Sequence, residues 1–215
     1  MTKIVKAKLI KYPLEYNAIL EYWNAIESGE IVASKKLKRV YKELVRKIND
    51  PNCQYVFDAE KANRAMEFIE NFCKNSKPKR GENPQIKLQL WQKALVSAIF
   101  GMVDKESRLR MVRELILIIA RKNGKSLLAS AIALYMLIAD GEKGAECVAV
   151  GTKKDQAKIV WSESVKMIKK SPALLKRTKC LVSEIKFDTT ESSYKPLASD
   201  SNSLDGLNVS YSAMD

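Results

Sequence analysis

The sequence predicts an α/β fold, in which a mostly parallel sheet is flanked by helices and preceded by a helical region. Three observations lead to this prediction. Amphipathic helical patterns fill residues 1–80. Beyond residue 87, short apolar runs typical of strands alternate with helical patterns. The 215 residues, 46% of them hydrophobic and 29% charged, are typical of a globular chain with its own core.

The N-terminal region carries apolar side chains at helical spacing. Residues 19–26 and 37–48 each show one apolar face, and so do residues 62–72. Asp58 precedes the third pattern and is expected to cap that helix. We therefore expect residues 1–80 to form a layer of packed helices.

A linker is expected next, because residues 74–87 hold two prolines, one glycine and a basic run. This predicts a domain boundary between residues 1–80 and 81–215. The pattern in the second part is that of alternating helices and strands. Helices are predicted at 88–100, 126–139 and 155–170, and strands at 115–120, 147–151, 181–187, 194–198 and 209–214.

One stretch carries a recognisable chemistry, namely LILIIA at 115–120 followed by RKNGKS at 121–126. Gly124 lets the backbone approach a phosphate, Lys125 supplies a cation, and the Ser126 hydroxyl is a ligand type for Mg²⁺. A helix that begins there offers its N-terminal dipole to an anion. We interpret this as a phosphate-binding loop, although Ile119 stands where the standard pattern has its first glycine.

A nucleotide-hydrolysing site of this kind needs a second strand that ends in an acidic residue, which holds Mg²⁺. The run 209–215, which ends in Asp215, is the candidate.

Composition excludes several function classes. The chain has no histidine, so Ser-His-Asp catalysis and His-ligated zinc are excluded within it. Its four cysteines show no C-x-x-C spacing, which predicts reduced thiols and a cytoplasmic location. The longest mostly apolar stretch, residues 127–139, is too short to span a membrane. The net charge of +13 indicates a polyanionic partner.

Several segments also resemble a known family. They are FIENF at 68–72, KLQLWQK at 87–93, ARKNGKSLLAS at 120–130, ALYMLIADGEKGAE at 133–146, TKKDQAKIVW at 152–161 and SLDGLN at 203–208. In this order they resemble the N-terminal part of large terminase subunits from tailed double-stranded-DNA phages, the ATPases of the packaging motor. The resemblance implies a P-loop NTPase fold of the ASCE type for residues 81–215.

The resemblance also implies roles for individual residues. Gln92 occupies the position that reads adenine, and Arg121 the position that senses the γ-phosphate. Asp215 aligns with the first acid of an Asp-Glu pair, so that Arg121, Lys125 and Asp215 form the expected catalytic set. Ser126 and Asp215 are the expected Mg²⁺ ligands. The expected ATP-binding set is Gln92, Arg121, Lys122, Asn123, Gly124, Lys125 and Ser126.

The expected partners follow from the same resemblance and from charge. Thr152, Lys153, Lys154 and Gln156 lie where the family couples ATP to double-stranded DNA. Residues 151–186 hold ten Lys/Arg against three Asp/Glu, which suits contact with a DNA backbone. The family implies a small terminase subunit, a portal protein and homo-oligomers as partners, in the cytoplasm of the host cell and without a membrane.

The sequence departs from the family in two respects. Leu90 stands where the family has a proline, and the family continues beyond the acidic strand with a catalytic glutamate and a nuclease domain. We therefore expect an N-terminal fragment, truncated at that strand, which binds ATP but hydrolyses it poorly. Two alternatives are a basic DNA-binding module with a vestigial nucleotide site and a helicase-like P-loop translocase of another family.

Overall fold

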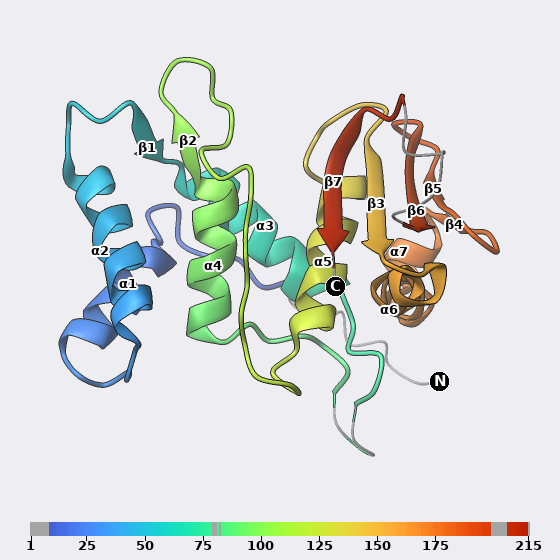
Figure 1. Cartoon of the computed structure of the whole chain (residues 1–215), viewed down its shortest axis with the longest axis horizontal. Coiled ribbons are helices and arrows are strands. Elements are labelled where there is room, and N and C mark those ends of the chain that lie inside the picture. Colours follow the sequence, from blue (N-terminus) through green and yellow to red (C-terminus); the bar gives the residue numbers. More distant parts are fainter. Residues whose placement is uncertain (1–8, 79–80, 82, 199–205, 215) are drawn as a thin grey trace, which may run out of the picture. The chain divides into compact units, whose positions relative to one another are not determined.

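The computed structural model describes residues 9–78, 81, 83–198 and 206–214 (Figure 1). The chain divides into two compact units. Unit 1 comprises Met1–Glu67 and Lys87–Ile116, and unit 2 comprises Phe68–Ile86 and Leu117–Asp215. Helix α3 contributes residues to both units. The domain boundary expected near residue 80 stays a prediction.

Unit 1 is mainly helical, as the apolar periodicity predicts. The predicted helices near residues 19–26, 37–48, 62–72 and 88–100 are all confirmed. A small antiparallel pair, β1 with β2, was not predicted, since strands of three residues leave almost no periodic signal. The elements are α1 (Ala18–Glu27), α2 (Lys35–Asn49), β1 (Tyr55–Phe57), α3 (Ala59–Phe72), α4 (Leu90–Gly101) and β2 (Met102–Asp104).

Side-chain caps fix where these helices begin. The Asn17 side chain accepts a hydrogen bond from the Ile19 amide at 3.0 Å. Ser34 caps α2 in the same way. The predicted cap of α3 is confirmed, because the Asp58 carboxylate accepts from the Lys61 amide at 3.0 Å.

An apolar cluster holds α1, α2 and α4 together. Tyr22 and Tyr41 meet edge to face, with ring centroids 4.8 Å apart. Gly101 ends α4 where there is no room for a side chain, since a Cβ there would lie 2.7 Å from the Phe57 ring and 2.8 Å from the Ala62 Cβ. The buried members of the cluster are Ile19, Tyr22, Trp23, Ile26, Tyr41, Leu44, Ala94, Ala98 and Met102.

Unit 2 is built on a five-stranded sheet with the order β4-β5-β6-β3-β7. β3 pairs in parallel with both β6 and β7, whereas β5 pairs antiparallel with β4 and β6. The sheet is therefore mixed, which corrects the prediction of a mostly parallel sheet: a short hairpin supplies its far edge. The strands are β3 (Glu146–Gly151), β4 (Lys179–Cys180), β5 (Ile185–Phe187), β6 (Ser192–Ala198) and β7 (Val209–Met214).

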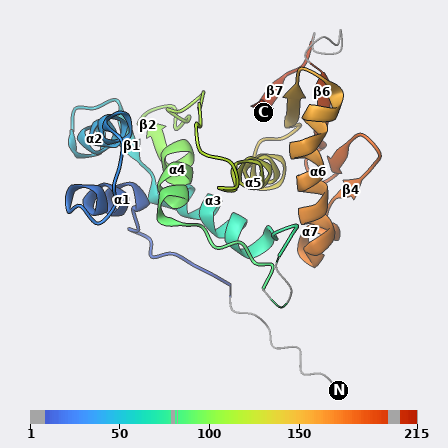
Figure 2. The same cartoon turned by 60° about the horizontal axis from the view of Figure 1, so that its bottom comes forward.

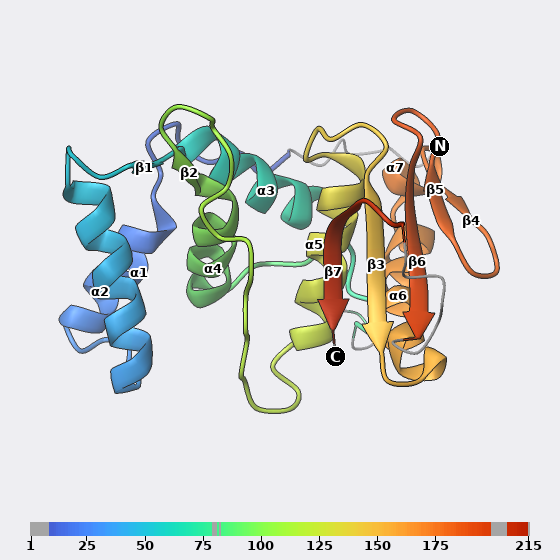
Figure 3. The same cartoon turned by 45° about the horizontal axis from the view of Figure 1, so that its top comes forward.

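Three helices complete unit 2: α5 (Lys125–Ile138), α6 (Lys154–Lys170) and α7 (Pro172–Leu175). α5 and α6 lie along one face of the sheet (Figures 2 and 3). α5 carries apolar side chains on nearly all sides, and it is accordingly buried from Ser130 to Leu137. No helix in the described ranges is long and apolar enough to cross a membrane.

The strand predicted at residues 115–120 is absent, and this prediction was wrong. The segment forms neither a helix nor a strand, and Ile116 and Ile118 are 87% and 90% exposed. An apolar run becomes a buried strand only where neighbouring strands provide ladder hydrogen bonds and other elements cover its faces. No strand among the described residues pairs with this segment.

Candidate functional site

The predicted phosphate loop is a tight turn that leads directly into α5. Lys122 and Gly124 have φ values of 67° and 76°, and Gly124 is the residue that precedes the first helical position, Lys125. The Asn123 side chain donates to the Ala120 carbonyl oxygen at 3.1 Å and closes the turn. A positive φ is natural for glycine but costs a lysine about 1–2 kcal/mol. Backbone strain of this kind is concentrated at functional sites.

The electrostatics of this turn favour an anion. The first amide groups of α5 point out of its N-terminus, and the helix dipole places partial positive charge there. Arg121, Lys122 and Lys125 add exposed cationic side chains within the same turn, whereas the first turn of α5 contains no acidic residue. The turn thus combines backbone donors, a dipole and three cations, which is the set that a polyphosphate requires.

Two hydrogen bonds, one buried and one partly buried, fix α5 in unit 2. The Ser130 hydroxyl donates to the Val160 carbonyl oxygen of α6 at 2.8 Å. The Tyr211 hydroxyl of β7 donates to the carbonyl oxygen of Ala129 at 3.1 Å. Both contacts lie within six residues of Lys125, so the helix that carries the loop is held from two sides.

α5 begins at the end of the sheet where β3 and β7 end (Figure 3). At that end, Gly151 closes β3 against α6, and a Cβ there would lie 2.6 Å from the Ala157 amide nitrogen. The next residue, Thr152, donates a hydrogen bond from its hydroxyl to the Gln156 side chain. The structure therefore brings together two of the predicted coupling residues. Lys153 is exposed at the start of α6, and the side chain of Lys154 lies outside the described parts.

Gln92, the residue expected to read adenine, belongs to unit 1, whereas the loop belongs to unit 2. It is 9% exposed in the first turn of α4. Its Oε1 accepts a hydrogen bond from the Gln89 amide at 2.9 Å, so it helps to cap the helix. Since Oε1 is engaged in this cap, the side-chain NH₂ group of Gln92 is the part that can bind a base while the cap stays in place.

The expected Mg²⁺ ligands are only partly described. Ser126 is the second residue of α5 and is half-buried. Asp215 lies outside the described residues. Within the described ranges, no group of three or more Cys, Asp or Glu side chains is placed to hold a metal ion.

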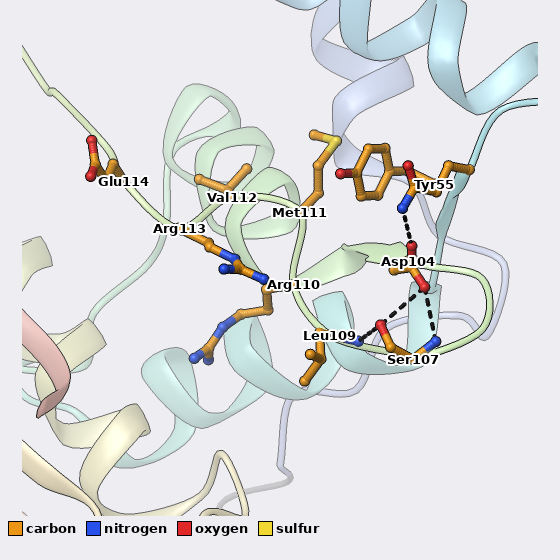
Figure 4. Close-up of a pocket in the computed structure, with 10 residues that line it drawn as sticks. Tyr55, Asp104, Ser107, Leu109, Arg110, Met111, Val112, Arg113 and Glu114 are labelled. Carbon is orange, nitrogen blue, oxygen red and sulfur yellow. Dashed lines mark hydrogen bonds between the residues drawn. The ribbon is translucent and has the colours of Figure 1, made fainter. Parts of the chain in front are cut away.

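A pocket of about 620 Å³ lies in unit 1, beside the turn after β2 (Figure 4). Asp104 organises that turn: it accepts from the Ser107 amide and hydroxyl at 2.8 and 3.0 Å and from Gln54 at 2.7 Å. These bonds lower the pKa of Asp104 to about 2, and the bond from the Ser107 amide contributes most. None of the predicted ATP-binding residues lines this pocket.

Sequence reasoning missed two residues that position the loop helix. Ser130 is a polar residue inside the apolar stretch of α5, which is the signal that its hydroxyl needs a buried partner. Tyr211 stands between two serines in β7 and gives no such signal. The partners come from other elements, Ala129 and Val160, and sequence spacing alone does not identify them.

Two comparisons with known proteins found matches to this chain. The family model "Terminase large subunit, ATPase domain" matches residues 90–215, more than half of the chain. Among solved structures, the chain is similar to the HK97 bacteriophage large terminase, with a TM-score of 0.59 and 26% sequence identity. That match covers 72% of this chain and 31% of the HK97 chain. No match is found among curated proteins.

The matched residues 90–215 contain the turn at 121–126, the helix that follows it and the strand β7. The site thus lies within the region that defines the family, and this decides against a translocase of another family. The chain belongs to the terminase large subunit family, whose ATPase-domain model it matches over residues 90–215.

Proposed function

We propose that unit 2 binds ATP through the turn at residues 121–126, as the nucleotide-binding part of a motor that packages double-stranded DNA. The observation that carries the proposal is the start of α5 at Lys125, directly after the left-handed Gly124. We propose that the helix amides, the helix dipole and the Lys125 ammonium act on the same anion. Membership of the terminase family supports ATP as the molecule whose phosphates bind at this turn.

Each residue of the turn has a proposed role. Lys125 contacts the β- and γ-phosphates, and Arg121 contacts the γ-phosphate, where a guanidinium can span two oxygens. The amides that follow Gly124 hold the phosphate chain. Lys122 adds positive charge at the mouth of the turn.

Ser126 and Asp215 are the proposed ligands of Mg²⁺, which when bound neutralises charge on the phosphates. A half-buried hydroxyl at the second position of α5, beside the lysine, has the donor chemistry that Mg²⁺ accepts. Gln92 is proposed to recognise the adenine base through its amide.

DNA contact is proposed at the loop after β3. The hydrogen bond between Thr152 and Gln156 joins this loop to the first turn of α6, so a shift of either is passed to the other. Lys153 and Lys154 provide charge for a phosphate backbone. The small terminase subunit, the portal protein and further copies of the chain are the proposed partners of the complete motor.

One experiment separates this proposal from a DNA-binding module with a vestigial nucleotide site. Thermal unfolding is followed during titration with Mg-ATP, for the wild type and for Lys125→Ala, and duplex DNA binding is measured for both. We expect ATP to raise Tm in the wild type alone, while DNA binding persists in both. An absence of nucleotide stabilisation in the wild type contradicts the proposal and favours the vestigial site.

A matched control is Lys143→Ala, which removes an exposed lysine from the loop after α5. It lowers the net charge by the same amount as Lys125→Ala, and we expect it to keep the ATP response. If both variants lose the response equally, net charge rather than the turn is responsible.

A further inference from the structure

Helix α2 in unit 1 is strongly basic, with seven Lys/Arg and a single acidic residue, Glu43, among its 15 residues. Four of the cations are spaced i, i+3, i+4 and i+7, so they lie on one face of the helix. All four are exposed. We call this set, Lys35, Lys38, Arg39 and Lys42, the cationic stripe.

The positive charge of the cationic stripe is not compensated by the described part of the chain. No ion pair joins any of its four members to a described carboxylate. The only acid of α2, Glu43, is engaged further along the helix: Arg46 donates to both its oxygens at 2.9 Å, and Lys47 lies 3.6 Å away. The hydrogen bonds from Arg46 lower the pKa of Glu43 to about 2, so it stays ionised and paired.

The position of the stripe on the helix makes this charge unfavourable for the isolated fold. The first turn of α2 contains no acidic residue, although acidic side chains are the ones that the positive end of a helix dipole favours there. Lys35, Lys36 and Lys38 are instead repelled by that end. A bound anion would remove this repulsion, since it is attracted by the lysines and by the dipole together.

The length of the stripe matches a nucleic-acid backbone. Seven residues of α-helix rise about 10 Å, and one strand of a duplex carries a phosphate about every 3.4 Å along its axis. Four cations on one face therefore span about three phosphates. A single small anion would leave most of these cations unpaired.

The opposite face of α2 decides against a membrane surface. An amphipathic helix binds a bilayer by inserting its apolar face. In α2 that face is used inside the protein, since Tyr41 and Leu44 are buried in the cluster of unit 1. Val40 is the only exposed large apolar side chain on the described helix.

We infer that the cationic stripe of α2 binds the phosphate backbone of a nucleic-acid duplex, without reading bases. This surface belongs to unit 1 and is distinct from the proposed DNA contact of unit 2 at residues 152–156. The inference rests on the proposed function only for the choice of duplex DNA as the ligand. It gives the helical unit a role in holding DNA, independent of nucleotide.

The test is the salt dependence of binding to a fluorescent DNA duplex of about 30 base pairs, between about 50 and 200 mM salt. The stripe variant is K35Q/K38Q/R39Q/K42Q, since glutamine removes charge but keeps helix propensity. The control is K11Q/K77Q/K87Q/K143Q, which removes four exposed and scattered lysines and so changes net charge equally.

We expect the stripe variant to bind the duplex at least about tenfold more weakly at low salt, with a slope of log K against log salt reduced by about 3. The control should keep most of the wild-type slope. The single variants Lys38→Gln and Lys42→Gln should each reduce the slope by about 0.9. If circular dichroism shows that the fourfold variant loses helix, the slopes of these single variants decide the test.

Equal losses of DNA affinity in the stripe and control variants would overturn the inference. An unchanged salt slope in the stripe variant would also overturn it. So would a stripe variant that binds DNA normally but no longer binds phosphatidylcholine vesicles containing phosphatidylserine, because the surface would then be a lipid contact. The stripe variant should keep the Tm increase with Mg-ATP. Loss of that response in the wild type would instead contradict the proposed function, so the two failures are distinguishable.

Discussion

The hydroxyl of Tyr211 donates a hydrogen bond to the carbonyl oxygen of Ala129, at 3.1 Å. This bond joins β7 to α5. The chain runs from β7 to Asp215, the expected acidic residue, and α5 begins with Lys125, the expected phosphate-binding lysine. Burial raises the pKa of Tyr211 well above its usual value, so the hydroxyl remains a donor throughout the ordinary pH range. The strand β7 and the helix α5 are thus linked by a partly buried polar contact.

Tyr211→Phe should destabilise the chain by about 1 kcal/mol, because it removes one partly buried hydrogen bond and keeps the ring. Urea unfolding at a fixed pH measures this. The control is Tyr16→Phe, which removes an exposed hydrogen bond to Glu21 and should have a smaller effect. Equal stability of Tyr211→Phe and wild type would show that the contact between β7 and α5 contributes nothing.

Gly151→Ala should destabilise unit 2 by about 1–3 kcal/mol, the usual cost of overpacking. The added Cβ would lie 2.6 Å from the Ala157 amide nitrogen and 2.9 Å from the Gln156 Cβ, so the start of α6 must move. Because Gln156 accepts a hydrogen bond from Thr152, we also expect weaker duplex DNA binding. Thr152→Val tests the hydrogen bond without overpacking, and should affect DNA binding more than stability. A Gly151→Ala protein with wild-type stability would contradict the close packing of β3 on α6.

β7 lies at one edge of the described sheet, and its residues Val209–Met214 contain no charge and no proline. Such edges pair with other chains unless charged side chains oppose this. We predict concentration-dependent self-association, reduced by Ser212→Lys, which places a charge at an exposed position of β7. Light scattering coupled to size exclusion measures both. A sharp monomer peak for the wild type at high concentration would contradict the prediction.

The helices were predictable because their signal is local. Ile19, Trp23 and Ile26 recur at helical spacing, and the side chain of Asp58 is a cap that sequence alone identifies. The strands β3, β6 and β7 were also placed within two residues at each end. These features depend on neighbours a few positions away.

The failures concern partners that lie far apart in the sequence. The run 115–120 has the composition of a buried strand, but strand formation depends on pairing that composition does not encode, and Ile118 is 90% exposed. The direction of β5 in the sheet depends on a hairpin with β4, which short apolar runs do not specify.

An amide NMR titration with Mg-ATP tests the central claim, that the turn before α5 holds the phosphates of a nucleotide. We expect the largest shifts at Gly124, Lys125 and Ser126. We also expect Lys125→Ala to reduce ATP affinity roughly tenfold or more, because it removes a charge-assisted hydrogen bond. Shifts that cluster instead around Asp104, in the pocket of unit 1, or an affinity unchanged by Lys125→Ala, would contradict it.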